Sequence, residues 1–261
     1  MDLKRKPFYL DDTAIEWVNN TLNGLTEDEK IGQLFFPIGF STEKEYLNHL
    51  RSLGIGGLFF RPGVAEEVQQ TYEYMQRTSK VPLLTAANLE DGGNGSSIEG
   101  TAFGNQMAVA ATNQTSDAYT LGKIASSEGK AVGVNFGFSP VVDLDLNFRN
   151  PITNVRTYGS DVERVIKNAK EYIQAFHDNG IMTSIKHFPG DGVDERDQHL
   201  LTSINSLSVD NWKKTFGKVY QELIDFGSKA VMVGHIAFPA YSGDEMPATL
   251  SPQLLQDLLR N

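Results

Sequence analysis

The chain has 261 residues, of which 40% are hydrophobic and 21% are charged, so it can bury a substantial core as one large domain or two small ones. Its formal net charge of −10, with lysine and arginine scattered along the chain, argues against binding to a nucleic-acid backbone. The chain contains no cysteine, which excludes disulfides, thiolate metal sites and cysteine nucleophiles.

The N-terminus begins with a short basic cluster, Lys4-Arg5-Lys6, which resembles the start of a signal peptide. The apolar stretch after it covers only residues 7–10 before Asp11-Asp12, which is too short for the apolar region of such a peptide. No apolar run approaches the roughly 20 residues that span a bilayer. We therefore expect a cytoplasmic protein that does not associate with a membrane.

Short apolar segments alternate with longer amphipathic segments along the chain. The predicted strands are 31–38, 56–60, 82–87, 134–142, 181–185 and 230–235. The predicted helices are 43–53, 65–78, 116–132, 161–177, 209–226 and 252–260, several of them opened by Ser, Thr or Asp as an N-cap. This alternation predicts a parallel sheet with helices packed outside it.

The strand segments are continuously apolar, which is typical of strands buried on both faces in a barrel or a doubly wound sheet. Polar, glycine-rich sequence follows most of them and would gather on one rim, which favours the barrel. The residues after the first strand lack the glycine-rich loop of a dinucleotide-binding fold. We therefore predict an α/β fold of the (β/α)8 TIM-barrel type over residues 1–261, C-terminally incomplete, with about six βα units present.

The segment from Lys186 to Leu200 is the richest of the chain in groups that can move protons, and it follows the predicted strand 181–185. Asp197 and His199 are separated by one residue, so the carboxylate can accept a hydrogen bond from one ring nitrogen while the other faces a substrate. This spacing predicts an oriented acid/base pair. The alternative is a surface loop in which the D-x-H pattern only caps a turn.

Other polar residues follow predicted strands and are candidates for a rim pocket. Lys186 and His187 end one strand and could bind hydroxyl groups, although a lysine there is more often simply solvated. The fork of Arg156 suits vicinal hydroxyls or a buried carboxylate such as Asp143. His235 ends the strand 230–235. No metal or cofactor is expected, because no motif with the ligand spacing of a metal site is present.

Several motifs occur in order along nearly the whole chain. They include Asn88-Leu89-Glu90-Asp91-Gly92-Gly93, Ser139-Pro140-Val141-Val142-Asp143, Arg156-Thr157-Tyr158-Gly159, and Lys186-His187-Phe188-Pro189-Gly190 followed by Asp197-Gln198-His199. Together they resemble the N-terminal barrel domain of glycoside hydrolase family 3, and specifically its β-N-acetylhexosaminidase branch, in which the Lys-His-Phe-Pro-Gly run precedes a D-x-H dyad.

The resemblance implies roles for named residues. Asp197 and His199 would be the general acid/base dyad, and Lys186, His187 and Arg156 would bind the sugar that is cleaved off. Glu90 and Asp91 would contact its outer hydroxyls, with His235 as a further rim residue. The chain departs from the family's usual Pro-Gly-His-Gly-Asp-Thr at residues 189–194 and from its usual D-x-E-G-G at residues 88–93.

The resemblance also implies a retaining mechanism that removes a terminal β-linked N-acetylglucosamine, with a nucleophilic aspartate carried after the next strand. This chain ends at Asn261, before that segment. A retaining glycosidase needs both a proton donor and an opposed carboxylate. We therefore expect a further C-terminal segment. Two alternatives stay open: a catalytically incomplete sugar-binding or structural fragment, and a β-N-acetylglucosaminide phosphorylase.

Overall fold

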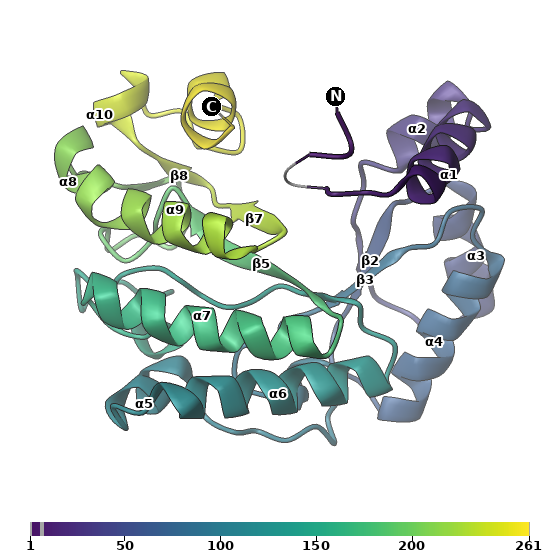
Figure 1. Ribbon diagram of the computed structural model, residues 1–261, viewed down its shortest axis with the longest axis horizontal. Coiled ribbons are helices and arrows are strands. Elements are labelled where there is room, and N and C mark those ends of the chain that lie inside the picture. The colour runs from purple at the N-terminus through teal and green to yellow at the C-terminus, as the bar shows by residue number, and fades with distance from the viewer. Residues whose placement is uncertain (1, 6–7, 261) are drawn as a thin grey trace.

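The computed structural model describes residues 2–5 and 8–260 and has an α/β architecture (Figure 1). Its main sheet has six parallel strands, which are, in spatial order, β1 (Ile38–Gly39), β2 (Gly57–Phe60), β3 (Leu84–Ala87), β4 (Phe136–Gly137), β5 (Met182–Phe188) and β7 (Ala230–Val233). A separate pair is formed by β6 (Ser203–Ile204) and β8 (Ile236–Ala237). The six main strands follow one another in space as in sequence, as in a barrel that winds in one direction.

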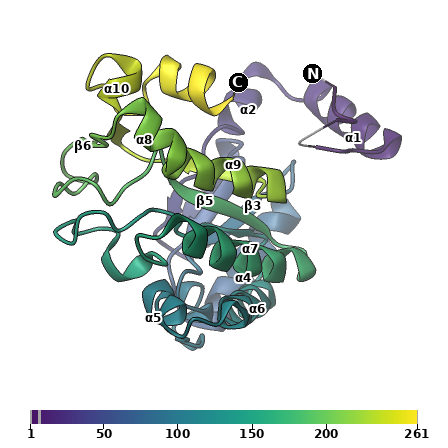
Figure 2. The same cartoon turned by 60° about the vertical axis from the view of Figure 1, so that its left-hand side comes forward.

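The helices are α1 (Asp12–Asn23), α2 (Glu27–Gly32), α3 (Lys44–Ser52), α4 (Ala65–Thr78), α5 (Gln106–Ala111), α6 (Thr115–Ala131), α7 (Val162–Asp178), α8 (Val209–Lys214), α9 (Phe216–Phe226) and α10 (Pro239–Ser242). The longer ones, among them α4, α6, α7 and α9, cover the outer side of this curved sheet, whereas α1 and α2 lie near the N-terminus and α10 lies near the C-terminal segment (Figures 1 and 2). Short turns η1 (Gly93–Gly95) and η2 (Asn154–Arg156) and the π-helical segment η3 (Gln253–Leu259) complete the described elements. The fold is therefore of the (β/α)8 barrel type, with six of its strands present, as predicted.

The apolar core has two parts. Between the strands and the helices, helix α7 buries one face that includes Ile173 and Phe176. On the inner side of the sheet, Phe59, Phe136 and Phe138 form an aromatic cluster with ring centroids 5.2–5.6 Å apart. Such ring pairs stabilise a core beyond the area that they bury. The two parts lie on opposite faces of the strands, which explains why the strand sequences are continuously apolar.

Buried polar side chains tie the helices to the loops that follow the strands. The Tyr172 hydroxyl on α7 donates to the Leu89 carbonyl at 2.7 Å and lies 2.7 Å from the Ser139 hydroxyl. Gln106 on α5 bonds both backbone groups of Val141, at 2.7 and 3.0 Å. A buried amide or hydroxyl is tolerated only with such partners. These contacts fix the loops that carry Glu90 and Asp143.

Several boundaries differ from the predictions. The segment 31–38 is wrong as a strand: α2 runs to Gly32, opened by a capping box between Thr26 and Glu29, and only Ile38–Gly39 pairs in the sheet. Leu34 is 84% exposed, so this apolar run is not buried as expected. The predicted strand 134–142 pairs in the main sheet at Phe136–Gly137 and, after a break, through a single bridge between Val141 and Lys186.

Other elements were divided or missed. The predicted helix 209–226 is interrupted at Thr215, whose φ of −117° and ψ of −100° are not helical. Helices α1 and α5 and the small β6–β8 pair had no counterpart in the prediction. Within the described residues, none of the helices combines the length and the apolar character that crossing a lipid bilayer requires.

Candidate active site

The candidate site lies where the loops after β3, β4, β5 and β7 meet at the carboxyl ends of the strands. Glu90 follows β3, Arg156 lies in the loop after β4, and Lys186 belongs to β5. The register between β5 and β7 shifts between Lys186 and Phe188, a local irregularity of the kind that re-aims side chains near active sites. The rim that the sequence predicted therefore brings these residues together from three segments.

Glu90 is the centre of a buried ion cluster. Its two carboxylate oxygens accept from Nε and Nη2 of Arg156 at 2.8 and 2.9 Å, and Lys186 Nζ lies 2.5 Å from Oε1. Lys186 Nζ also donates to Asn88 Oδ1 at 3.1 Å, and the lysine side chain is only 2% exposed. The prediction of Asp143 as a carboxylate partner of Arg156 is wrong. The guanidinium makes a bidentate contact with Glu90 instead, because the loop after β3 and the loop after β4 lie close together.

The charges of this cluster support one another. Burial by itself would raise the pKa of Glu90, but the Lys186 ammonium and the Arg156 guanidinium outweigh it and lower the pKa to about 2. Burial lowers the pKa of Lys186, and the neighbouring Glu90 carboxylate opposes that effect. Glu90 is therefore an anion at neutral pH and an acceptor held by two cations, a poor candidate for a proton donor.

A cavity of about 350 Å³ opens beside this cluster, lined by Asn88, Glu90, Asp91, Asn94, Gly95 and Arg156. Within the described part of the chain, Oδ1 of Asp91 and Oδ1 of Asn94 are buried and have no hydrogen-bond partner. Burial and the adjacent Glu90 raise the pKa of Asp91. The lining presents carboxylate, amide and guanidinium groups, and such a set of donors and acceptors suits a ligand with several hydroxyl groups. Asn94 was not predicted as a site residue. Its position in a glycine-rich loop after a strand is the sequence signal that could have indicated it.

His187 belongs to a second buried group. Its ring Nδ1 lies 2.7 Å from Oδ2 of Asp143, while its backbone N–H donates to Oδ1 at 3.1 Å. Asp143 is completely buried and also accepts from the backbone N–H of Asp191 at 2.8 Å. Since Nδ1 faces Asp143, Nε2 is the ring nitrogen that can meet a ligand. The pairing of Asp143 with His187 was missed, because 44 residues separate the partners.

Asp197 and His199 form the contact that their spacing predicted. Oδ1 of Asp197 lies 2.7 Å from Nδ1 of the ring and accepts from the His199 backbone N–H at 2.8 Å. These two hydrogen bonds lower the pKa of Asp197. The His199 side chain is 64% exposed and that of Asp197 29%. Among the described residues, no hydrogen bond or ion pair joins this pair directly to Glu90, Arg156 or Lys186.

His235, the last candidate, lies just after β7 and is exposed. Its Nδ1 is 3.0 Å from the Thr249 hydroxyl, and its backbone N–H donates to Oε1 of Gln198 at 3.0 Å. The structure therefore places it beside the loop that carries Asp197 and His199, at the edge of the rim. Gln198 did not feature among the predicted site residues.

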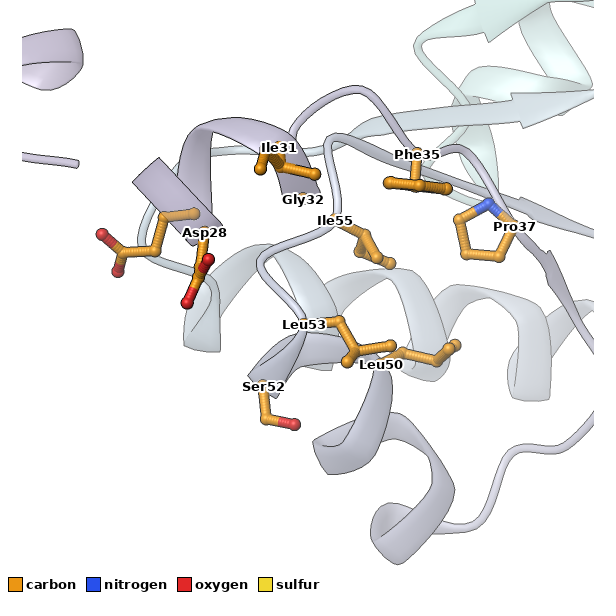
Figure 3. A pocket seen from close by; sticks show the side chains of 10 residues that line it. Asp28, Ile31, Gly32, Phe35, Pro37, Leu50, Ser52, Leu53 and Ile55 are labelled. Atoms are coloured by element: carbon orange, nitrogen blue, oxygen red, sulfur yellow. The ribbon is translucent and has the colours of Figure 1, made fainter. Parts of the chain in front are cut away.

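A larger cavity of about 570 Å³ lies elsewhere (Figure 3). Its lining is mainly apolar, with Ile31, Phe35, Leu50 and Leu53 around it, and comes from α2, α3 and the segments that precede β1 and β2. It is thus at the opposite ends of the strands from the polar rim. No group of three or more His, Asp or Glu suited to holding a metal occurs among residues 2–5 and 8–260.

The fold and the polar cluster define the class: a (β/α)8-type domain with a ligand site at the carboxyl ends of its strands. Residues 26–261 match the family model of the glycosyl hydrolase family 3 N-terminal domain, so the chain belongs to glycoside hydrolase family 3.

Relatives with curated names point in the same direction. The chain is similar to a beta-N-acetylglucosaminidase/beta-glucosidase of Cellulomonas fimi, with 47% identity over 271 aligned positions, covering 100% of this chain and 48% of the relative. It is also similar to beta-hexosaminidase A of Pseudoalteromonas piscicida, with 31% identity over 76% of this chain and 38% of the relative. The chain thus spans about half or less of the length of these relatives.

Two solved structures share the fold closely. One is a beta-glucoside phosphorylase, BglX, bound to 2FGlc, with a TM-score of 0.94 and 44% identity over 99% of this chain and 48% of that protein. The other is a family 3 beta-N-acetylglucosaminidase from Paenibacillus sp. str. FPU-7, with a TM-score of 0.85 and 28% identity over 91% of this chain and 47% of that protein.

Proposed function

We propose that residues 1–261 form the N-terminal barrel domain of a cytoplasmic retaining enzyme that removes terminal β-linked N-acetylglucosamine. The observation that carries this proposal is the Glu90–Arg156–Lys186 cluster beside a polar cavity, in a family 3 domain that also holds an oriented Asp197–His199 pair. The relatives named as β-N-acetylglucosaminidases support the substrate class.

The buried cluster would bind the sugar. The Lys186 ammonium and the Arg156 guanidinium donate to ring hydroxyls, while Glu90 holds both cations in place. Asp91, which lines the cavity, would accept from an outer hydroxyl. His187, steered by Asp143, would donate or accept through Nε2. His235 would border the site at the side of the leaving group.

The bond cleavage would follow double displacement. A carboxylate from outside residues 1–261 attacks the anomeric carbon, and His199 protonates the leaving glycosidic oxygen. A covalent glycosyl-enzyme forms and the aglycone departs. His199, now neutral, then takes a proton from the incoming water, which displaces the carboxylate. Asp197 holds the ring through Nδ1, so that Nε2 faces the leaving oxygen and carries the transferred proton.

A second function is favoured by one observation, the similarity to a beta-glucoside phosphorylase at a TM-score of 0.94. An imidazole acid/base carries less negative charge than a carboxylate, so a phosphate anion can approach the covalent intermediate with less repulsion. Phosphate would then replace water as the acceptor and the product would be a sugar 1-phosphate. The sugar itself would be glucose or N-acetylglucosamine, the two that the name of the C. fimi relative covers.

The test uses the full-length protein and His199→Ala. Removing a general acid costs about 10²- to 10⁴-fold in rate when the leaving group is poor, such as a second sugar. The loss should be much smaller on a nitrophenyl β-N-acetylglucosaminide, whose leaving group needs little protonation. His49→Ala, an exposed histidine on α3, is the matched control. Unchanged cleavage of the disaccharide by His199→Ala would remove the dyad from the mechanism.

The same assay separates the alternatives. Product analysis with and without inorganic phosphate distinguishes a sugar 1-phosphate from the free sugar. The 261-residue chain alone should bind sugar without turnover, because the attacking carboxylate is expected outside it. Turnover by this chain comparable to that of the full-length protein would contradict the incomplete-fragment reading.

A further inference from the structure

Gln198, between Asp197 and His199, faces away from solvent. Gln198 is only 5% exposed, whereas the side chains of its neighbours Asp197 and His199 are 29% and 64% exposed. The loop therefore turns its acid/base pair outward and its amide inward. A buried amide needs partners for both its N–H and its carbonyl.

The Gln198 amide uses both of its ends. Nε2 donates to Oδ2 of Asp191 at 2.7 Å, and Oε1 accepts from the His235 backbone N–H at 3.0 Å. A Cβ atom at Gly234 would lie only 2.5 Å from this Oε1, so glycine leaves the room for the approach. The side chain thus bridges the loop after β5 to the end of β7.

Asp191 is itself immobilised. Its Oδ1 accepts from Asn150 Nδ2 and from the Gly192 backbone N–H, both at 2.7 Å, and its backbone N–H donates to Asp143. Asp143 in turn holds the ring of His187. Burial, together with the nearby Asp143, raises the pKa of Asp191, so each donor to its carboxylate matters.

We propose that Gln198 is a positioning residue that holds the Asp197–His199 pair at the rim by bridging Asp191 to the end of β7. This inference rests on the proposed function, in which His199 protonates the leaving oxygen. Gln198 does not touch the substrate; it acts through the backbone of its two neighbours. The same chain of hydrogen bonds reaches His187, so the proton donor and the sugar-binding residues share one rigid support.

The experiment compares Gln198→Leu with the wild type in the full-length protein. Leucine keeps most of the volume and removes both hydrogen bonds. A misplacement of about 1 Å can cost about 10²-fold in rate, so kcat on a disaccharide should fall about 10- to 100-fold with KM little changed. On the nitrophenyl glycoside, which needs little acid assistance, kcat should fall less than about threefold.

Gln174→Leu is the matched control, because Gln174 also donates to a carboxylate, Oδ1 of Asp178 at 2.8 Å, but on the exposed side of α7. It should leave both substrates unaffected. A second measurement is a double-mutant cycle with Asp191→Asn. If Gln198 acts through Asp191, the double variant should lose no more activity than the more damaging single variant.

The outcomes are distinguishable. Equal loss on both substrates with a lower Tm would make Gln198 a structural residue only and overturn the inference, as would activity unchanged on the disaccharide or additive losses in the cycle. A wild-type protein that cleaves neither substrate would defeat the proposed function instead. An active wild type with an unaffected Gln198→Leu variant defeats the inference alone.

Discussion

The Glu90–Arg156–Lys186 cluster and the Asp197–His199 pair are both charged, yet their surroundings are opposite. In the cluster the Lys186 and Glu90 side chains are 2% and 11% exposed, and each charge has its partner within hydrogen-bond distance. The His199 side chain is 64% exposed and has one carboxylate partner two residues away. The cluster is built by tertiary structure, whereas the pair is built by local sequence.

This difference separates two tasks. A group that binds sugar hydroxyls gains from being fixed before the substrate arrives, because no ordering cost remains at binding. A group that exchanges protons with a leaving group and then with an acceptor needs access to both. The comparison therefore predicts that changes in the cluster alter stability, and that changes in the pair alter rate.

The largest effect is expected from Lys186→Met. It leaves the Glu90 carboxylate buried with Arg156 as its remaining cation, and breaking a buried pair in this way costs about 3–5 kcal/mol of unfolding free energy. Urea unfolding at pH 7 measures it. Lys170→Met removes the half-exposed ion pair with Glu222 and should change stability much less. Equal losses in the two variants would contradict a special role of burial.

A smaller effect on the unfolding free energy is expected from lowering the pH until Glu90 is protonated. Its pKa in the folded state, about 2, lies below the ordinary value of 4.5, so the unfolded chain takes up the proton first as pH falls. The stability that this carboxylate contributes, roughly 3 kcal/mol by linkage, is present above about pH 4.5 and is lost toward pH 2.

Glu90→Gln should remove that dependence. The difference in unfolding free energy between the wild type and Glu90→Gln should shrink as pH falls from 4.5 to 2, measured by urea unfolding at several pH values. Glu163→Gln, on the exposed side of α7, is the control and should follow the wild type. A constant difference across this range would mean that Glu90 is not the group that titrates.

The smallest effect is expected from Asp197→Asn. The amide keeps the shape of the side chain but loses the carboxylate that accepts from Nδ1 and orients the ring, so kcat/KM on the disaccharide should fall about tenfold. The urea midpoint should stay at the wild-type value, because the His199 ring is largely exposed and its contact with Asp197 is local. A shifted midpoint with unchanged kcat/KM would reverse the comparison between the two regions.

Much of the fold could be predicted because its signals are local. The bounds of α4 agree with the prediction and those of α7 differ by one residue. Both helices are recognised by the periodicity of their own apolar residues, and α7 also by the Asp161 N-cap next to it. The strand predicted at 31–38 failed because a short apolar run does not say whether it is buried. The capping box of Thr26 and Glu29 was the missed signal.

The contacts of the site likewise fall into local ones, which the sequence predicts, and long-range ones, which it does not. The Asp197–His199 contact spans two residues and was predicted from spacing. The contact of Glu90 with Arg156 joins residues 66 positions apart, and the link from Gln198 to His235 spans 37. No local pattern carries such pairs, so Arg156 was considered with the wrong carboxylate, and Asn94 and Gln198 were overlooked.

By itself, the sequence determined the alternation of strands and helices, the polar loops after the strands, and the family to which they belong, because each of these is carried by short ordered motifs. Only the tertiary structure decided which charges are buried and paired. Burial depends on which loops the folded sheet brings together at its rim. In a low-dielectric site, that arrangement makes Glu90 a fixed anion and leaves His199 accessible to solvent.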